Sequence, residues 1–353
     1  MKYKADWPEA RAKLIALWEG RGLKGPCVAV TAPSGERVPA PPRPSEADAE
    51  RRWLDRDWVL ADLQASLANT WWGGTAIPSY LLMAGWVFCY GARPTFHLNT
   101  IWHEPAPVDF DAPPQFTVDW DEPYCRKYVE LYQAAVALAG RDDFLVGRPC
   151  ALPACDLLAA RLGTEAFLVA LSDHPQWMRA ALEQMARGQL DVCRRFRAMT
   201  EPTHDFWYGN PGWMPLWGPR PYLSTQSDVS CMLSPKMFDQ FVLPELRLYC
   251  QEHGALWYHL DGSDARQHLP SLLSLPELRF VQYVPRPGEP PNGPGQLPLY
   301  RQIQAAGRIV HVQVAPEHVL PLLRELDPRL LCLQTWCRTI AEAQELLAKA
   351  EQV

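Results

Sequence analysis

The sequence predicts an α/β protein in which mainly parallel strands are covered by helices. Strand and helix patterns alternate through the last hundred or so residues, which is typical of strand–helix–strand units. The strands in this part are apolar almost throughout, as expected of strands covered on both faces. With about eight strands in the whole chain, a (β/α)8 barrel is favoured. A doubly wound open sheet is the alternative, although no GxGxxG motif follows a strand.

The length fits one domain. The chain has 353 residues, 48% of them hydrophobic, and no internal repeat, so it falls just above the usual size of a single barrel. We therefore expect one domain over residues 1–353. It carries a proline-rich loop near 33–52 and tryptophan-rich insertions near 71–120 and 204–222.

The carboxyl-terminal half gives the clearest elements. An amphipathic helix is predicted over 234–254, with Ser234 as its cap, a proline at its first position and Gly254 at its end. Strands are then predicted at 255–260, 278–284, 308–314 and 329–335, with helices near 264–274, 298–306, 316–325 and 338–351.

The amino-terminal half is less regular. A first strand is predicted at 26–32, followed by the proline-rich loop and a helix over 51–69. Further strands are predicted at 115–120, 143–147 and 204–209, and further helices near 122–139, 153–171 and 174–199.

Composition excludes several classes of function. The net charge is −6 and the basic residues are scattered, so a nucleic-acid partner is not expected. No run of about 18 apolar residues could cross a bilayer, and the first residues lack the pattern of an export signal. We therefore expect a soluble cytoplasmic protein, with its ten cysteines reduced.

Four segments of the chain resemble the uroporphyrinogen-decarboxylase-like proteins, a superfamily that includes corrinoid-protein methyltransferases and cobalamin-independent methionine synthase. They read WWGGTAIPSYLLMAGWVFCYG, STQSDVSCMLSPKMFDQFVLPELR, WYHLDGSDARQHLPSLLSLPELRFVQYVP and LYRQIQAAGRIVHVQV. The resemblance covers most of the chain and is most specific over 224–284. It implies a TIM barrel with its ligand funnel at the carboxyl ends of the strands. The arginine-rich start of the true decarboxylases is missing, which argues against heme biosynthesis.

The resemblance also implies a metal site. The methyltransferases hold zinc with a His-x-Cys motif at one strand end and a cysteine after the last strand. Here His259-Leu260-Asp261-Gly262 takes the place of that motif, and Cys337 follows the last strand. An Asp oxygen can also bind zinc, so the expected ligands of Zn²⁺ are His259, Asp261 and Cys337. Cys231 or Asp228 could supply a further ligand.

The residues themselves leave other roles open for each candidate. His259 and Asp261 lie two apart in an extended chain and so point the same way, but they could also be a core histidine and a helix cap. Cys337 could be a buried thiol. Asp228 could orient His259, accept a hydrogen bond from substrate, or cap a helix.

Aromatic and amide side chains are the candidates for lining a substrate pocket. The 15 tryptophans, many in irregular segments, indicate either an aromatic pocket or padding of a proline-rich surface. Polar residues inside apolar strands must face something polar. The candidate lining residues are Trp72, Trp207, Tyr208, Trp257, Tyr258, Gln282, His311 and Gln334.

Three functions are compatible with these patterns. The first is a zinc-assisted methyltransferase that acts on a small substrate or a corrinoid-linked methyl group, with catalytic Asp228, His259 and Asp261. A corrinoid protein as partner and a homodimer would agree with the resemblance. The second is a metal-independent decarboxylase-type lyase in which His259 handles a proton. The third is a non-catalytic protein that binds a cationic or planar ligand in an aromatic cage.

Overall fold

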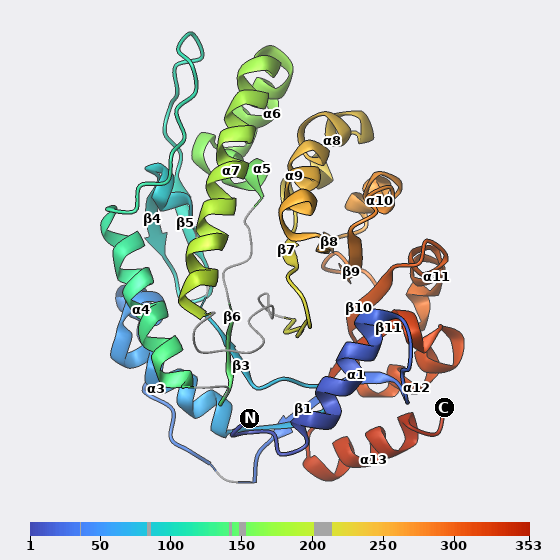
Figure 1. The fold of residues 1–353 in the computed structure, drawn as a ribbon. Coiled ribbons are helices and arrows are strands. Elements are labelled where there is room, and N and C mark those ends of the chain that lie inside the picture. Colours follow the sequence, from blue (N-terminus) through green and yellow to red (C-terminus); the bar gives the residue numbers. More distant parts are fainter. Residues whose placement is uncertain (36, 83–85, 141–142, 148–152, 201–213) are drawn as a thin grey trace.

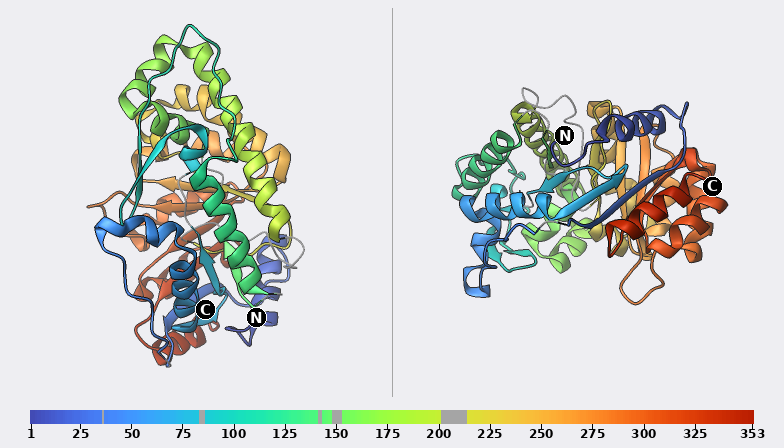
Figure 2. Two further views of the ribbon diagram at one scale, coloured as in Figure 1. Left: turned by 90° about the vertical axis from the view of Figure 1, so that its left-hand side faces the viewer. Right: turned by 90° about the horizontal axis from the view of Figure 1, so that it is seen from below.

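The computed structural model describes residues 1–35, 37–82, 86–140, 143–147, 153–200 and 214–353. These residues form a mixed α/β fold in which helices lie outside a set of central strands (Figure 1). The views from the side and from below show helices on both flanks of the strands, as predicted for an α/β protein (Figure 2).

The main sheet has seven strands in the order β2-β1-β11-β10-β9-β8-β7. Its neighbours are parallel, except that β2 pairs antiparallel with β1 at one edge. The strands are β1 (Cys27–Pro33), β2 (Thr70–Gly74), β7 (Leu223–Thr225), β8 (Leu256–Asp261), β9 (Leu278–Val284), β10 (Ile309–Gln313) and β11 (Leu331–Trp336).

Two pairs of short strands lie apart from this sheet. One is parallel and the other antiparallel: β3 (Ser79–Leu81) with β6 (Leu145–Gly147), and β4 (Arg93–Phe96) with β5 (Ile101–Glu104). Among the described residues the strand pairings do not join into a closed ring.

Thirteen α-helices occur in the described residues. They are α1 (Trp7–Glu19), α2 (Ala49–Leu54), α3 (Arg56–Ala68), α4 (Pro123–Ala139), α5 (Ala154–Leu162), α6 (Thr164–Asp173), α7 (Pro175–Thr200), α8 (Pro235–Phe241), α9 (Leu243–His253), α10 (Leu269–Leu273), α11 (Leu297–Ala305), α12 (Pro316–Glu325) and α13 (Ile340–Ala350).

Alternation along the strands gives the main sheet two different faces. One face packs on the surrounding helices and holds the largest core cluster, with Tyr258 and Leu260 of β8 among its members. The other face carries Trp257 of β8 and Phe280 of β9 near the amino-terminal ends of the strands, where Trp18 of α1 packs against them. Helix α1 therefore covers one end of this second face, and the carboxyl-terminal end of the same face holds the polar side chains described below.

The predicted strands of the carboxyl-terminal half are confirmed within two residues at each end, as is the first strand near 26–32. Three predicted helices are instead each divided in two. The break near Asp55 follows from its side chain, which accepts a hydrogen bond from Trp58 N and so starts a new helix. The other breaks lie at Gly163, whose φ is 86°, and before Pro244, which cannot continue the hydrogen-bond ladder of α8.

The prediction of a strand at 115–120 is wrong. This segment has no strand pairing, and its backbone is held by side-chain and loop contacts instead, with Phe116 N donating to Gln184 Oε1 at 3.0 Å. The predicted strand at 204–209 lies outside the described residues. The strands β2, β3, β4, β5 and β7 were not predicted; all are short, with three to five residues each.

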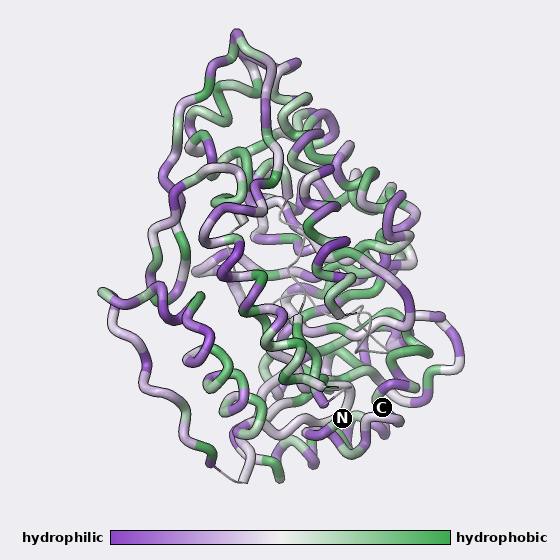
Figure 3. Tube along the Cα trace, turned by 60° about the vertical axis from the view of Figure 1, so that its left-hand side comes forward, coloured by the Kyte–Doolittle hydropathy of each residue, from purple (hydrophilic) through white to green (hydrophobic). Residues whose placement is uncertain are grey.

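Hydrophobic chain segments gather along the strands and the inner sides of the helices (Figure 3). Within the described residues no helix combines the length and the apolar character needed to cross a bilayer.

Candidate functional site

Three polar side chains meet where β7 and β8 end. His259 and Asp261 alternate along β8 and so share one face, and Asp228 opens a short 3-10 turn, Asp228–Met232, after β7. Because β7 and β8 are parallel neighbours, their carboxyl ends lie side by side. One ligand atom from each of these residues lies within 4.8 Å of the others. The imidazole is buried, and both carboxylates are exposed.

Gln282 fixes the orientation of His259. It lies directly across from His259 on β9, and its amide nitrogen donates to Tyr283 O at 3.0 Å. The amide oxygen therefore faces His259 Nδ1, which donates a hydrogen bond to it. In this tautomer the lone pair is on Nε2, on the side of Asp261, whose Oδ1 lies 3.7 Å away.

His259 is held in its neutral form. Burial lowers the pKa of its imidazole below the ordinary value, against the opposing effects of the Gln282 hydrogen bond and the Asp261 charge. A neutral imidazole with a fixed tautomer can bind a metal or accept a proton.

Asp156 of α5 holds the turn that carries Asp228. Its two carboxylate oxygens accept hydrogen bonds from the backbone nitrogens of Asp228 and Val229, each at 2.9 Å. Sequence reasoning missed this residue, because an aspartate in the first turn of a helix is an ordinary finding. Only the packing of α5 against the turn after β7 shows its partners.

The carboxylates near the turn raise one another's proton affinity. Loss of hydration raises the pKa of Asp228, and the charges of Asp156 and Asp261 raise it further. Loss of hydration also raises the pKa of Asp156, against its two backbone hydrogen bonds. Such a group gains stability by taking up either a proton or a cation.

The structure does not bring Cys337 to this group. Its side chain is buried in the helix-side core cluster, where burial raises the pKa of the thiol. Trp336 and Gln334 line a cavity on the other face, so alternation turns the next residue away. The predicted ligand set His259, Asp261 and Cys337 is therefore not assembled in this structure, and Asp228 lies in the third position.

Cys231 lies near the same carboxylates. Its side chain is half-buried, and burial together with the charges of Asp264, Asp228 and Asp261 raises the pKa of its thiol. It is not one of the three grouped residues.

The predicted lining residues divide between a cavity and the core. Trp72 and Gln334 line a cavity of about 190 Å³ at the ends of β1, β10 and β11, together with Gln313 and Trp336. Neighbouring strands lie about 4.8 Å apart, so the β10 wall of this cavity is roughly 10 Å from β8 on the same face. The cavity and the polar group are thus neighbours.

His311 and Trp257 form a buried hydrogen-bonded pair on this face. Trp257 Nε1 donates to His311 Nδ1 at 3.0 Å, and the Gln334 amide lies 3.1 Å from His311 Nε2. Burial lowers the pKa of His311 to about 3, so the ring is neutral. Tyr258 points to the opposite face and packs among the helices, because it alternates with His259. Trp207 and Tyr208 lie outside the described residues.

No protein-family model and no curated protein matches this sequence. Among solved structures, a methyltransferase from Methanosarcina mazei superposes with a TM-score of 0.58 over 97% of this chain and 98% of that chain, at 12% sequence identity. At this identity the likeness concerns the fold. The chain thus has the same overall mixed α/β architecture as that methyltransferase over nearly the full length of both.

Proposed function

We propose that this protein is a metal-dependent methyltransferase whose divalent cation, Zn²⁺ in the first instance, is bound by Asp228, His259 and Asp261. The observation that carries the proposal is the meeting of these three side chains at the ends of β7 and β8. One imidazole and two carboxylates give three protein ligands and leave a position for substrate, as in catalytic zinc sites. Their two negative charges would offset those of the cation.

The donor set fits a metal in a second respect. A metal-bound histidine usually donates its other ring nitrogen to a neighbouring acceptor, and His259 does so to Gln282. Without a thiolate ligand the set is harder than the family's His-x-Cys arrangement, so Mn²⁺ is a second cation to compare with Zn²⁺.

The likeness of folds supports the same proposal. The solved methyltransferase has the same architecture, and sites at the carboxyl ends of parallel strands are typical of (β/α)8 barrels. We therefore also propose that the described strands belong to a uroporphyrinogen-decarboxylase-like TIM barrel in a single domain. A corrinoid protein as methyl carrier, a homodimer and a cytoplasmic location are parts of this proposal.

The side chains would divide the work as follows. A bound cation would supply Lewis acidity, by which a substrate thiol loses its proton at neutral pH. Gln282 keeps the His259 lone pair aimed at the site, and Asp156 keeps Asp228 in place. The cavity beside Trp72 and Gln334 would hold the remainder of a small substrate. Trp207 and Tyr208 would enclose it.

Metal content and methyl transfer test the proposal together. Purified protein should bind about one equivalent of Zn²⁺, and His259→Ala or Asp261→Asn should weaken binding at least about tenfold. Cys337→Ser is the matched control and should bind as the unchanged protein does, because that thiol lies in the core. Methylcobalamin and a small thiol serve as probe substrates, with cobalamin absorbance as the readout. Unaltered zinc affinity in His259→Ala would overturn the proposal.

A metal-independent lyase is the second candidate, favoured by the raised pKa of Asp228, which makes this carboxyl a better proton donor near neutral pH. It predicts release of carbon dioxide from a small acid by protein stripped of metal, with loss of that activity in Asp228→Asn. Activity that depends strictly on added metal would exclude it.

A further inference from the structure

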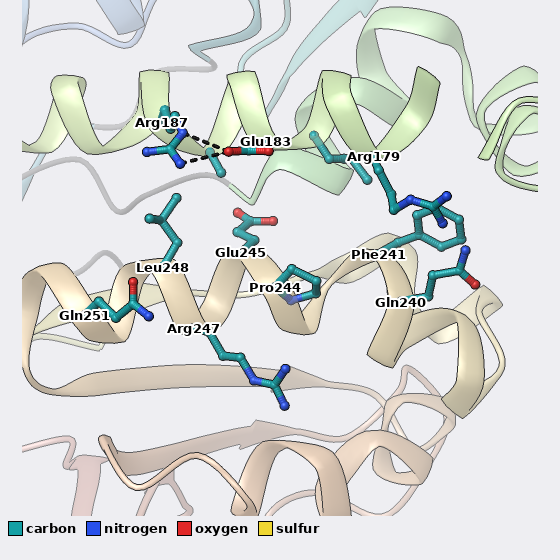
Figure 4. A pocket seen from close by; sticks show the side chains of 12 residues that line it. Arg179, Glu183, Arg187, Gln240, Phe241, Pro244, Glu245, Arg247, Leu248 and Gln251 are labelled. Carbon is teal, nitrogen blue, oxygen red and sulfur yellow. Dashed lines mark hydrogen bonds and ion pairs between the residues drawn. The ribbon is translucent and has the colours of Figure 1, made fainter. Parts of the chain in front are cut away.

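A second cavity lies in the outer helical layer. It has a volume of about 350 Å³ and lies between α7 on one side and α8 and α9 on the other (Figure 4). None of the residues at the ends of β7 and β8 lines it. Its walls are largely apolar and come from Leu182, Ala186, Phe241, Pro244 and Leu248.

A buried carboxyl group lies in the middle of this groove. Glu245 of α9 is 4% exposed and points from α9 toward α7 (Figure 4). Its Oε1 accepts a hydrogen bond from Ala154 N at 2.7 Å, but its Oε2 has no hydrogen-bond partner among the described residues. The Tyr249 hydroxyl is close enough to affect the pKa of Glu245 but does not meet the geometry of a hydrogen bond.

An unpartnered buried oxygen costs about 1–3 kcal/mol, which a ligand that supplies a partner would recover. Burial raises the pKa of Glu245 to about 7, so near neutral pH the carboxyl can donate a hydrogen bond to an oxygen of a ligand.

The charges around the groove favour an anion. Glu183 is paired with Arg187 through hydrogen bonds of 3.1 and 2.8 Å. Arg179, one helical turn before Glu183, has no ion pair with any residue that the structure describes, and it reaches toward Phe241 and Gln240 (Figure 4). A guanidinium group in this position offers a planar pair of donors to a carboxylate.

We propose that this groove is a binding site for small amphipathic carboxylates. The anionic head would lie between Arg179 and Glu245, and the apolar body would run along Leu182, Ala186 and Leu248. An alkylammonium would fit less well, because its charge would meet Arg179. The inference does not depend on the proposed methyl transfer.

Calorimetric titration of the full chain with decanoate tests the site. Decanol and decyltrimethylammonium serve as neutral and cationic probes of the same chain length. We expect decanoate to bind at least about tenfold more tightly than either, since loss of the ion pair and of one hydrogen bond removes about 1.4 kcal/mol or more. Arg179→Gln and Glu245→Gln should each weaken decanoate binding by a similar factor.

The variants are chosen so that a folding defect cannot imitate the result. Arg179 is exposed, and the glutamine at 245 can still accept the hydrogen bond of Ala154 N. Arg324 is an exposed arginine on α12 outside the groove, and Arg324→Gln is the matched control that should bind decanoate unchanged. Equal binding of the three probes, decanoate affinity unchanged in Arg179→Gln, or no binding at millimolar decanoate would each overturn the proposal.

Discussion

At the scale of single residues, the site depends on two side chains that would not themselves touch a substrate. Gln282 sets the tautomer of His259, and Asp156 holds the turn of Asp228 through two backbone hydrogen bonds. Both act by limiting the positions that the grouped side chains can take. Their removal should therefore change affinity for a cation without unfolding the protein.

Gln282→Ala should weaken Zn²⁺ binding by about 10- to 100-fold, because the imidazole of His259 loses the acceptor that selects its tautomer. Competition with a chromophoric chelator measures the affinity. Gln313→Ala, a change to an exposed amide at the end of β10, is the control and should leave it unaltered. Equal affinities for both variants would show that Gln282 has no positioning role.

Asp156→Ala should release the backbone nitrogens of Asp228 and Val229, so their amide hydrogens should exchange with solvent faster. Zinc affinity should fall in parallel, and Asp156→Asn, which keeps one acceptor, should give an intermediate result. Glu165→Ala, in the first turn of the next helix, is the control. Unchanged exchange at Asp228 would contradict the role assigned to Asp156.

At the scale of elements, predictions succeeded where a local pattern was sufficient. Strands β8 to β11 are apolar runs bounded by turn residues, and helices α4 and α7 have clear starts and ends, so their positions could be read directly. Helix breaks depended on single residues such as Asp55 and Gly163. Strand β2 escaped prediction because its two glycines and two tryptophans lack an alternating pattern; it exists through pairing with β1.

Gly74 shows how that pairing constrains the sequence. Its φ is 58°, and a Cβ there would lie 2.1 Å from Val28 O of β1. Gly74→Ala should therefore combine backbone strain with a clash. Gly288→Ala has a φ of 89° but open space around the added carbon, and should cost about 1–2 kcal/mol from strain alone. Urea unfolding should show Gly74→Ala to be the less stable by at least about 1 kcal/mol. Equal stabilities would mean that β2 can move away from β1.

At the scale of the whole molecule, the site was only partly predictable from sequence. His259 and Asp261 lie on one strand, so strand alternation alone placed them together. The inclusion of Asp228 rests on the pairing of β7 with β8, and Asp156 on the packing of α5, both contacts between distant segments. Cys337 failed as a ligand because its direction depends on where β11 ends relative to its neighbours, which one sequence does not reveal.

The stability of the whole chain should depend on pH through His311. Its pKa is about 3 in the folded protein, against 6.5 ordinarily. Below pH 6.5 the unfolded chain therefore takes up a proton that the folded chain refuses, and stability falls as the pH falls. Relative to His311→Gln, the protein should lose up to about 1.4 kcal/mol per pH unit. Urea unfolding at pH 7, 6 and 5 measures this, and parallel curves for both proteins would contradict it.

The nine-residue helix α5 begins beside one of the two proposed sites and reaches the other within a single turn. Glu245 accepts a hydrogen bond from its first residue, and Asp156, two residues later, holds the turn of Asp228. If an occupant of the groove shifts this helix, thermodynamic linkage requires the effect to be mutual. Whatever factor a fatty acid anion imposes on the affinity for zinc, zinc must impose on the affinity for the anion.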